Sequence, residues 1–554
     1  MNQSNLISSD AHRLNCFPYA VGHGFDGVCL IIQMGPHRIM LDCGVRDFAN
    51  LQNILEVPVE LVFCTHAHED HARGLQALNQ AFPQIPIYAS EVTAQLLHLN
   101  WIREPLASSN LDSHFCQALP WSVPVELAAD LTIELFPAGH LPGSAAVLLT
   151  YNTSERIYKL FYTGDFALSN SRLVEGLSIE KLRGLSPDVL IIEGTYGTAR
   201  YPRRRQQENQ LMERINQALS HQHSVLLPLP SLGLGQEILM LLRSHHQFTG
   251  RDLDIWVDGS VALGCDAYLD LLSYFPASVQ NFARHQPLFW DERVRPRMRR
   301  LTEEQYPQTE DPPCIILTDY QTDLSSYFHN CNHTGVILLP EQPRTEIGHD
   351  LEKIIAIALE LGLEIETYFL ANHCDGLGTN QLIHNLRPQH VMFIHGSPVY
   401  LADLTGLEEL HNRYQLHSPS AGTMVEFYLG ETFIQPTTPL ETNYQGELNE
   451  QETGVNIFLP DRIISDPRWR NLADTGLVEA RWQGEELVLR GVSQKELLNQ
   501  SSNARISIDI DIDCCAICRY QRGQRCWNQA SPLYSFRVTP EGYCPVFEPI
   551  EIEE

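Results

Sequence analysis

The stretch Thr65-His66-Ala67-His68-Glu69-Asp70-His71 carries the clearest chemical signal in the 554-residue chain. It follows the apolar run LVFC, which has the length and composition of a buried strand, so the motif is expected to begin where a strand ends. Neutral imidazole and carboxylate are the ligand types that borderline cations such as Zn²⁺ take. A regular helix or strand could not aim all of these side chains inward. The spacing therefore predicts a loop folded around two metal ions.

Other apolar runs of strand length surround this motif, and several lead into an acidic or histidine side chain. Asp42 lies in RIMLDCG, His140 ends LTIELFPAGH, Asp165 ends KLFYTGD and Glu193 lies in VLIIEGTYG. Sites of α/β proteins are usually built where strand ends meet at one rim of a sheet, so we expect these side chains to lie close together. A second α/β pattern follows, after which LEIETYFLANH and HVMFIHG return to the strand-to-His pattern. The economical interpretation is one site in two halves, separated by an insertion.

These residues resemble the ordered motifs of the metallo-β-lactamase superfamily. The stretch from His66 to His71 resembles the family's HxHxDH motif, and Asp42, His140 and Asp165 resemble its first, third and fourth motifs. Three further residues resemble motifs A, B and C of the β-CASP branch, which processes nucleic acids and includes RNase J and the mRNA 3′-end endonuclease. They are Glu193 in IIEGTYG, His373 in FLANHCDG and His395 in FIHGSP.

The resemblance covers roughly residues 14–430 and implies the fold. We expect an α/β chain built as a metallo-β-lactamase αββα sandwich, with an inserted β-CASP α/β cap domain and a small Cys-rich C-terminal extension. The expected segments are 12–197 for the first part of the catalytic domain, 198–364 for the cap, 365–432 for the return segment, 433–504 for a linker and small β-rich module, and 505–554 for the tail.

The resemblance also implies roles for the site residues. It assigns His66, His68 and His140 to one metal ion, Asp70, His71 and His395 to the other, and Asp165 to both, while Asp42 supports the metal loop. Two Zn²⁺ ions would activate a metal-bridging hydroxide for attack on phosphorus. In this scheme Asp42 and Asp70 are also counted as catalytic. His373 would protonate the departing 3′-oxygen, and Glu193 would orient its other ring nitrogen.

The chain departs from the branch's pattern in the wall that would bind substrate. Leu234, in SLGLGQE, stands where many caps carry an Arg, and CIILTDYQTD supplies Thr318, Asp319 and Tyr320 in place of an SGM segment. Arg203, Arg204 and Arg205 could supply substrate contacts instead, as could the cluster within residues 293–300, or both groups could be solvated helix faces. The HxD form of His373 and Asp375 favours an endonuclease over a 5′-exonuclease.

The charge and hydropathy of the chain limit the partners that can be expected. Lys and Arg number 38 against 68 Asp and Glu, which gives a formal net charge of −30. Such a surface disfavours indiscriminate nucleic-acid binding, so RNA is expected in a focused cleft. No apolar run is long enough for a bilayer span, and no secretory signal is recognised at the start. We expect a cytoplasmic protein without a membrane partner, and a homodimer is left open.

The tail contains a cysteine ladder of the form C-x2-C-x7-C-x17-C. Its members are Cys515, Cys518, Cys526 and Cys544, with Cys514 as a substitute ligand or an unused neighbour. Four thiolates suit one further Zn²⁺ or a [4Fe-4S] cluster, and the sequence does not choose between them. A disulfide framework is disfavoured for a cytosolic chain.

The function that these expectations favour is a two-metal phosphodiester hydrolase, a ribonuclease of the endonuclease type. Two alternatives stay open at the level of sequence. One is a hydrolase of a small ester or small phosphodiester with the same fold, which the missing Arg and the acidic balance suggest. The other is a non-catalytic β-CASP scaffold subunit, against which the intact ligand set argues. RNA preference, cleavage polarity and the role of residues 455–492 do not follow from the sequence.

Overall fold

The fold is taken from a computed structural model of the chain, which separates into two compact units, residues 1–440 and 441–554. The structure describes residues 14–23, 27–48, 51, 59–102, 115–302, 312–322, 324–327, 335–341 and 349–429 of the first unit, and 447–451, 454–458, 478–483, 486–491, 520–522 and 525–526 of the second.

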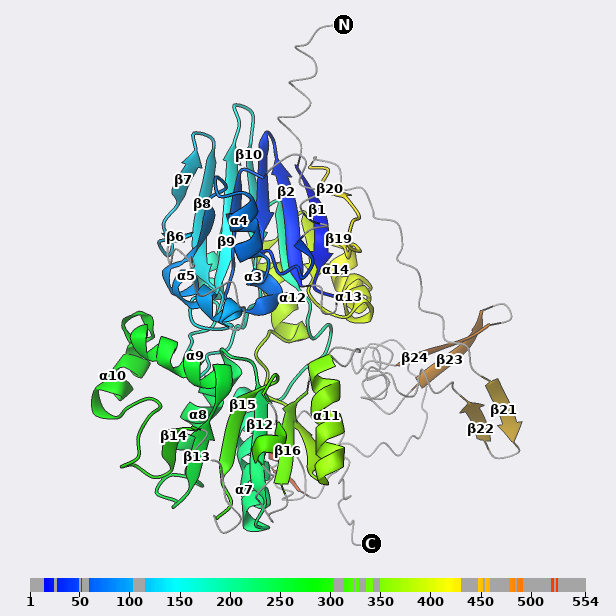
Figure 1. Ribbon diagram of the computed structural model, residues 1–554. Coiled ribbons are helices and arrows are strands. Elements are labelled where there is room, and N and C mark those ends of the chain that lie inside the picture. The colour runs from blue at the N-terminus through cyan, green and yellow to red at the C-terminus, as the bar shows by residue number, and fades with distance from the viewer. Residues whose placement is uncertain are drawn as a thin grey trace, which may run out of the picture. The chain divides into compact units, whose positions relative to one another are not determined.

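The first unit contains two seven-stranded sheets that stack face to face (Figure 1). The first sheet has the order β20 (Val425–Glu426), β1 (Leu14–Val21), β2 (Val28–Met34), β3 (His37–Leu41), β4 (Leu61–Phe63), β5 (Ile87–Ser90) and β6 (Cys116–Leu119). The second has the order β19 (Gln415–His417), β18 (His390–Ile394), β11 (Val189–Glu193), β10 (Ile157–Tyr162), β9 (Ala145–Asn152), β8 (Leu131–Pro137) and β7 (Val125–Ala128).

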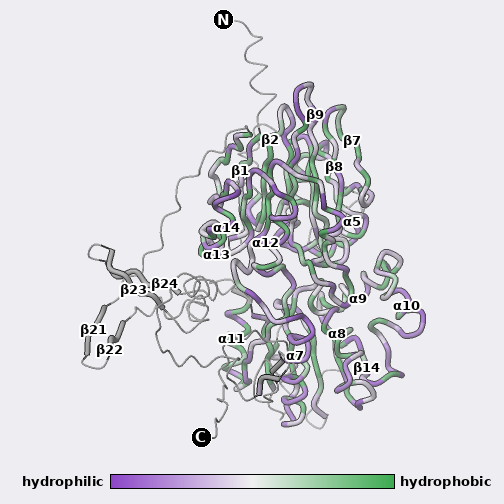
Figure 2. The backbone as a smooth tube through the Cα atoms, turned by 180° about the vertical axis from the view of Figure 1, so that it is seen from behind, coloured by the Kyte–Doolittle hydropathy of each residue, from purple (hydrophilic) through white to green (hydrophobic). Residues whose placement is uncertain are grey.

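Successive side chains of a strand point to opposite faces of its sheet, and in these apolar strands the side chains on both faces can be buried. Leu30 and Ile32 of β2 share one core with Leu149 of β9 and Tyr162 of β10, so this core fills the space between the two sheets. Figure 2 shows hydrophobic residues running along the strands of both sheets. Neighbouring residues of the same strands point outward, and these second faces need helices to cover them.

Helices cover the outer faces. Leu75 and Leu78 of α4 (Leu75–Ala81) pack with residues of the first sheet, and Leu382 and Leu386 of α12 (Gly376–Leu386) pack with the second. The layers are therefore helix, sheet, sheet and helix, which is the αββα sandwich that the sequence predicts. The other helices of this part are α3 (Glu69–Ala72), α5 (Glu91–Leu96), η1 (Leu97–Trp101), α6 (Ile179–Leu182), α13 (Pro398–Thr405) and α14 (Glu408–His411).

The inserted cap is an α/β layer around a six-stranded parallel sheet, drawn in green in Figure 1. Its order is β14 (Arg297–Arg300), β13 (Asp254–Val257), β15 (Ile315–Asp319), β12 (Ser224–Leu229), β16 (Gly335–Pro340) and β17 (Glu364–Tyr368). Its helices are α7 (Arg204–Ser220), α8 (Leu234–Ser244), α9 (Gly259–Asp270), η2 (Leu272–Tyr274), α10 (Ala277–His285), η4 (Leu324–Tyr327) and α11 (His349–Leu361).

One strand lies elsewhere than the sequence pattern suggests. The run LEIETY, assigned above to a return segment from residue 365, forms β17 and pairs with β16 inside the cap sheet. The crossover helix α11 returns the chain parallel to β16, which makes β17 the next strand of that sheet. The chain therefore leaves the cap after Tyr368.

The two halves of the sandwich are joined in the second sheet. β18, from the return segment, pairs in parallel with β11, the last strand before the cap, so that Glu193 lies opposite Ile394. In Figure 1 the yellow return elements α12, α13, β19 and β20 lie among the blue and cyan elements of the first segment. This pairing brings the ends of β11 and β18 together at one rim, although almost 200 residues separate them.

A buried histidine ties the two sheets together away from that rim. The Nδ1 atom of His37 lies 2.9 Å from Glu60 Oε2, and its Nε2 atom lies 2.8 Å from Asp130 Oδ1. Burial opposes a charge on this ring, but the two carboxylates raise its pKa above the usual value. The pair of contacts links the start of β3 with the turn between β7 and β8.

The His37 contacts predict a pH-dependent stability. The stabilisation is fully present below about pH 6.5, the unfolded pKa of His, and is lost as the pH rises through the higher folded pKa. Because both carboxylates are partly exposed, His37→Gln should lower the free energy of unfolding by only about 0.2–1 kcal/mol at pH 6, and by less at pH 9. Urea unfolding at both pH values measures this, and an equal loss at pH 6 and 9 would contradict the ionic contribution.

In the second unit the described residues form three short hairpins. They pair β21 (Glu447–Gln451) with β22 (Gly454–Phe458), β23 (Val478–Gln483) with β24 (Glu486–Gly491), and β25 (Gln521–Arg522) with β26 (Arg525–Cys526). The first four strands fall in or beside the segment expected to be β-rich. The proposed ligands Cys515, Cys518 and Cys544, and the side chain of Cys526, lie outside the described residues.

Candidate metal centre

The predicted ligands are carried to one place by the ends of strands. Asp42 follows β3, the His66 motif follows β4, and Asp165 lies three residues after β10. In the same way His140 follows β8, Glu193 ends β11 and His395 follows β18. Three groups of side chains come within metal-binding reach: His66, His68, His140 and Asp165; Asp70, His71 and His395; and Asp165, Glu193, His373 and His395.

Asp42 holds the metal loop from beneath. Its buried carboxylate accepts hydrogen bonds from the Thr65 backbone N–H at 2.7 Å, the Thr65 hydroxyl at 3.0 Å and the Tyr162 hydroxyl at 2.7 Å. The ring of His71 donates to it from Nδ1 at 2.8 Å. With Nδ1 used in this way, Nε2 of His71 is left to face the centre of the site.

Close backbone approach makes room for this loop. A Cβ atom on Gly44 would lie only 1.7 Å from the carbonyl oxygen of Asp70, so no other residue fits there. Asp42 and His395 both have left-handed backbones, with φ of 59° and 52°. Such strain in non-glycine residues is held in place by surrounding structure and is concentrated at functional sites.

The first group brings three imidazoles together at short range. Nδ1 of His68 lies 3.2 Å from Nε2 of His66 and 3.0 Å from Nε2 of His140. The opposite nitrogen of each ring faces an oxygen: Nε2 of His68 faces the Leu232 carbonyl at 3.4 Å, and Nδ1 of His140 faces the Asn372 carbonyl at 2.8 Å. For His66 that oxygen is the Thr65 hydroxyl, which lies 3.0 Å from Nδ1.

These outer contacts determine which nitrogens carry protons. A carbonyl oxygen can only accept, so His68 and His140 donate outward and turn their lone pairs toward each other. The Thr65 hydroxyl already donates to Asp42, so it accepts from His66, whose Nε2 is then also a lone pair. Three lone pairs at such distances repel unless a cation lies between them. The donor set therefore fits a borderline divalent metal ion.

Asp165 joins the two ligand groups. Its Oδ2 atom lies 3.5 Å from Nε2 of His66 and 3.7 Å from Nε2 of His140. Its Oδ1 atom lies 3.4 Å from both Nε2 of His71 and Nδ1 of His395. Nε2 of His71 and Oδ1 of Asp165 are buried and have no hydrogen-bond partner among the described residues, which is expected where a cation belongs.

The remaining members of the second group are Asp70 and His395. Oδ2 of Asp70 lies 3.3 Å from Nε2 of His395. Burial lowers the pKa of His66 and of His140 well below the usual range, so these rings are in the neutral form that binds metal. Burial acts the same way on His71, but the Asp165 and Asp42 carboxylates outweigh it and raise the pKa well above the usual range.

His373 lies beside the metal ligands and is held by Glu193. Its Nδ1 atom lies 2.9 Å from Oε2 of Glu193, and its ring centroid is 4.6 Å from that of His140. Burial opposes protonation, but the Glu193 and Asp165 carboxylates raise the pKa of His373. Glu193 also accepts the Phe166 N–H at 2.8 Å, which fixes the carboxylate.

Thr195 is a site residue that the sequence analysis did not single out. Its hydroxyl contacts Oε2 of Glu193 and lies 2.9 Å from Nδ1 of His395 and 3.4 Å from Nδ1 of His373. It therefore connects the residues that resemble motifs A, B and C. Its position could have indicated a role in the site, because Thr195 lies only two residues after Glu193, the last residue of β11.

Comparison with known proteins identifies the family. Residues 37–225 match the family described as the Beta-lactamase superfamily domain. The chain belongs to the metallo-β-lactamase superfamily. With its inserted cap it is a member of the β-CASP branch, and it is a metal-dependent hydrolase.

Three relatives illustrate the range of similarity. The uncharacterized protein sll0514 of Synechocystis sp. is 46% identical over 97% of each chain. The probable RNase MJ4 of Methanocaldococcus jannaschii is 30% identical over 42% of this chain and 56% of its own length. Integrator complex subunit 11 of Danio rerio is 22% identical over 68% of each chain. This chain thus spans little more than half of the probable RNase.

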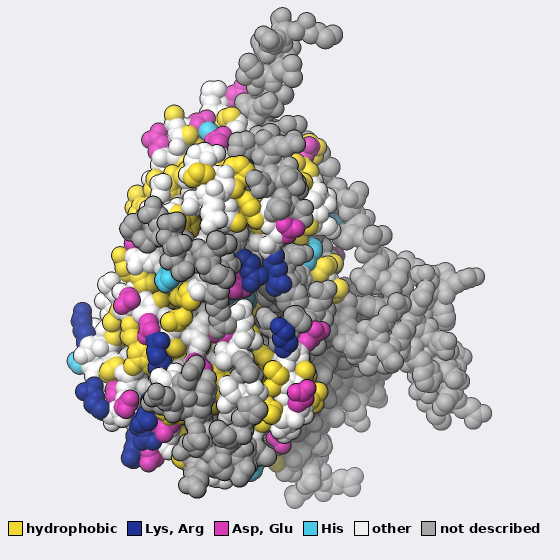
Figure 3. All heavy atoms as spheres, viewed as in Figure 1, with side chains coloured by type: hydrophobic (Ala, Val, Ile, Leu, Met, Phe, Trp, Pro, Cys, Tyr) yellow, Lys and Arg dark blue, Asp and Glu magenta, His cyan; other side chains and the backbone are white. Residues whose placement is uncertain are grey.

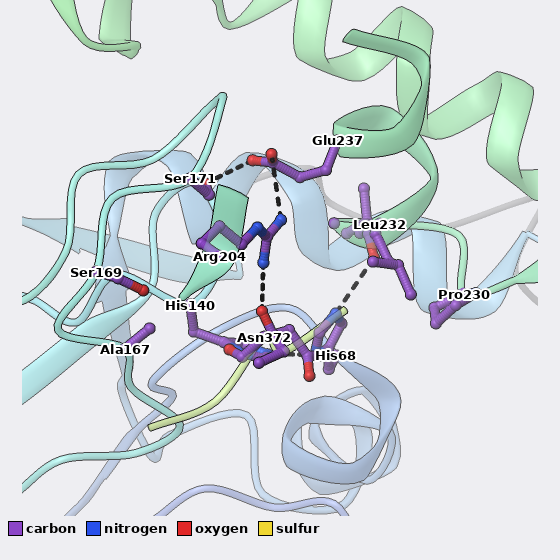
Figure 4. Close-up of a pocket in the computed structure, with 14 residues that line it drawn as sticks. His68, His140, Ala167, Ser169, Ser171, Arg204, Pro230, Leu232, Glu237 and Asn372 are labelled. Atoms are coloured by element: carbon purple, nitrogen blue, oxygen red, sulfur yellow. Dashed lines mark hydrogen bonds and ion pairs between the residues drawn. The ribbon is translucent and has the colours of Figure 1, made fainter. Parts of the chain in front are cut away.

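In this β-CASP protein a small pocket lies where the cap meets the metal ligands (Figure 4). Its volume is about 40 Å³, and its lining includes His68, His140 and Asn372 together with Leu232, Glu237 and Arg204. Arg204 contacts the Ala371 carbonyl, and its guanidinium lies 3.5 Å from Glu208 and 3.7 Å from Glu237. Leu234, in the place of the branch's Arg, also lines the pocket.

The three arginines proposed as substrate contacts have different surroundings. Arg204 lines the pocket with a side chain that is 16% exposed, whereas Arg203 and Arg205 are exposed and are not part of its lining. The second Arg cluster is largely neutralised by acidic neighbours: Arg297 pairs with Asp252 and Asp254, and Arg300 with Asp266. Figure 3 shows several blue Lys and Arg side chains of the cap beside magenta Asp and Glu side chains.

No helix among the described residues is long and apolar enough to cross a membrane.

Proposed function

We propose that the protein is a ribonuclease that hydrolyses RNA phosphodiester bonds with two zinc ions, and that it cuts as an endonuclease. The observation that carries this proposal is the position of Asp165, whose two oxygens face the two ligand groups separately. Relatives whose names refer to an RNase support RNA as the substrate class. His66, His68 and His140 would hold one ion, and Asp70, His71 and His395 the other.

Bound metal ions would supply an activated water molecule and a positive charge that stabilises the phosphoryl oxygens. The chain itself must supply a proton to the departing 3′-oxygen, because an alkoxide is a poor leaving group. His373 is the group placed for this step, because it lies beside His140. Glu193 accepts a hydrogen bond from its Nδ1 and so favours the doubly protonated ring, whose Nε2 proton would pass to the 3′-oxygen. The Thr195 hydroxyl fixes the Glu193 carboxylate and leaves the His373 ring few alternative orientations.

The endonuclease assignment is supported by the residue two positions after His373. The carboxylate of Asp375 accepts the Gly378 N–H at 2.8 Å and caps α12, so its position at the start of that helix is fixed. A terminal 5′ phosphate carries more negative charge than an internal phosphodiester. A fixed carboxylate at this point therefore disfavours a terminal phosphate more strongly than an internal one.

The pocket supplies one candidate phosphate contact, Arg204. Its partner Glu237 accepts three other hydrogen bonds, from the Ser171 hydroxyl and from the N–H groups of Arg172 and Leu173. Glu237 therefore stays satisfied if the guanidinium turns to a phosphate. This would compensate for the Leu at position 234.

Arg204→Ala is expected to raise KM for RNA by about 10- to 100-fold, because a charge-assisted hydrogen bond is worth about 1.5–3 kcal/mol. The slope of log KM against log salt should fall by about one. The neighbouring exposed Arg205→Ala serves as the matched control and should change neither quantity. A loss confined to kcat would mean instead that Arg204 positions the Ala371 segment, and would contradict a substrate contact.

The substrate class and cleavage mode are tested together with zinc-loaded protein. A circular RNA, the same RNA in linear 5′-monophosphorylated form, a chromogenic phosphodiester and a thioester are offered in parallel. We expect cleavage of both RNAs by wild-type protein, cleavage of neither by Asp70→Ala, and wild-type rates for Glu69→Ala, which changes an exposed residue of the same motif.

Each other outcome overturns a stated part of the proposal. Cleavage of the linear RNA alone would replace the endonuclease by a 5′-exonuclease. Cleavage of the small esters alone would replace RNA as the substrate. Failure to cleave any of the four by metal-loaded protein would favour a non-catalytic subunit.

A further inference from the structure

A backbone carbonyl of the cap is in contact with a metal ligand. Nε2 of His68 lies 3.4 Å from the carbonyl oxygen of Leu232, and Figure 4 shows this contact crossing from the metal loop to the cap. The distance is longer than the roughly 2.7–3.2 Å of an ordinary N–H···O hydrogen bond, so its orienting effect depends on how firmly the carbonyl is held. Leu232 itself is buried, with 3% of its surface exposed.

The turn that aims this carbonyl requires a glycine. Gly233 has φ of 92° and ψ of −93°, a conformation that side-chain-bearing residues avoid, and α8 begins at the next residue. A Cβ atom there would lie 3.7 Å from Nε2 of His68, so the difficulty is the backbone conformation rather than a clash. A substitution at Gly233 would rotate the peptide that carries the Leu232 carbonyl.

Side chains from two other cap elements hold the turn. The Ser231 hydroxyl donates to the Ser260 hydroxyl at 2.6 Å, and the Ser260 hydroxyl and N–H both donate to Oδ2 of Asp319, at 2.9 and 2.7 Å. Gln236, which is fully buried, donates to the Ser231 carbonyl at 3.0 Å. The path from Asp319 to His68 thus runs through consecutive hydrogen bonds and the backbone from Ser231 to the Leu232 carbonyl.

Asp319 ends strand β15 in the segment that departs from the branch's pattern. Its other carboxylate oxygen accepts the Gln321 N–H at 3.0 Å and the Thr322 hydroxyl at 3.1 Å, and only 5% of the residue is exposed. The carboxylate is therefore rigidly placed at the end of a central strand of the cap sheet. This makes it a suitable anchor for the Ser260 and Ser231 hydroxyls.

We propose that the Leu232 carbonyl orients the metal ligand His68, and that Asp319, Ser260 and Gly233 act as positioning residues for this carbonyl. The contact between the cap turn and His68 and the occupation of the metal site therefore favour each other. The inference rests on the metal site of the proposed function. Outer partners of metal-binding histidines fix the tautomer and raise ligand basicity. By thermodynamic linkage, a cap contact that strengthens metal binding is itself strengthened by the metal.

The test compares zinc affinities of variants by competition with a chelator. Gly233→Ala is expected to weaken binding of one of the two zinc ions by about 10–100-fold. The matched control is Gly250→Ala, which changes a cap glycine that also has positive φ, 80°, but has open space around it. Ser260→Ala should lower the affinity by a smaller factor, and Ser224→Ala, a buried cap serine outside the network, should leave it unchanged.

The reciprocal effect is measured first on wild-type protein with and without zinc, a comparison that does not depend on whether a variant folds. Zinc should slow amide hydrogen exchange of residues 230–237 in wild-type protein and should have a much smaller effect on this segment in His68→Ala. Equal zinc affinities for Gly233→Ala and Gly250→Ala would overturn the proposal, as would exchange in residues 230–237 that ignores zinc.

Neither readout uses RNA, so the two proposals can fail separately. Protein that shows the coupling but cleaves no RNA would contradict the proposed substrate and leave the coupling standing. Protein that cleaves RNA while the two glycine variants bind zinc equally would contradict the coupling alone.

Discussion

RNA cleavage by the His373→Ala variant is expected to fall by about 10²–10⁴-fold at neutral pH, while its zinc content stays at the wild-type value. The ring of His373 is held by Glu193 at 2.9 Å and lies against His140, so its loss removes the proton donor without removing a proposed metal ligand. The rate and the zinc content of the same preparation are the quantities to measure.

A substrate with a good leaving group distinguishes a proton donor from a structural residue. A nitrophenyl phosphodiester needs no proton on its departing oxygen, so His373→Ala should hydrolyse it at close to the wild-type rate. His384→Ala, on the same chain segment but paired with Tyr414 and Glu409, is the matched control and should leave both rates unchanged. Equal losses on RNA and on the nitrophenyl substrate would contradict the general-acid role.

The Asp165→Ala variant is expected to lose zinc as well as activity, because Asp165 faces both ligand groups. We expect zinc content to fall well below two ions per chain. Loss of about 4 kcal/mol of charge stabilisation corresponds to a rate decrease of about 10³-fold, and the decrease should be at least of this order.

Elemental analysis of purified Asp165→Ala, beside its cleavage rate, checks this expectation. Asp270→Ala changes an exposed carboxylate at the end of α9 and is the control for effects of net charge. An Asp165→Ala protein that kept both zinc ions would show that this carboxylate does not join the two groups.

The sequence indicated where the candidate site residues lie along the chain, because strand ends are encoded locally. Asp42 and the His66 motif follow neighbouring parallel strands of the first sheet, whereas His140 and Asp165 follow strands of the second sheet, and the stacking of the two sheets brings these strand ends together. The αββα layers were expected from the resemblance to the metallo-β-lactamase superfamily. The pairing of β11 with β18 was not predicted, because nothing local to either strand specifies it.

Contacts between segments far apart in the chain were not predictable. The carbonyls of Leu232 and Asn372, which orient His68 and His140, belong to backbone groups that any residue carries, so no side-chain pattern reveals them. Thr195 was missed although it contacts three proposed site residues, because one threonine after a strand has many ordinary roles.

The arginines illustrate the same limit for charge. Arg203, Arg204 and Arg205 are equivalent in sequence, yet helix α7 turns only Arg204 toward Glu237 and the pocket. The pairing of Arg297 with Asp252 and Asp254 depends on the parallel register of β13 and β14, which the sequence does not show. The number and spacing of Arg residues in the sequence therefore could not distinguish the proposed phosphate contact, Arg204, from Arg residues that acidic neighbours neutralise.

The most direct test of the account is the rate of RNA cleavage by chelator-stripped protein as zinc is added back in measured equivalents. The account predicts no cleavage without metal and a rate that rises until two zinc ions are bound per active site. Any zinc held by the tail is determined separately, by comparison with protein truncated after residue 440. Cleavage that persists in the presence of chelator, or a zinc-saturated protein that leaves RNA intact, would contradict the central claim.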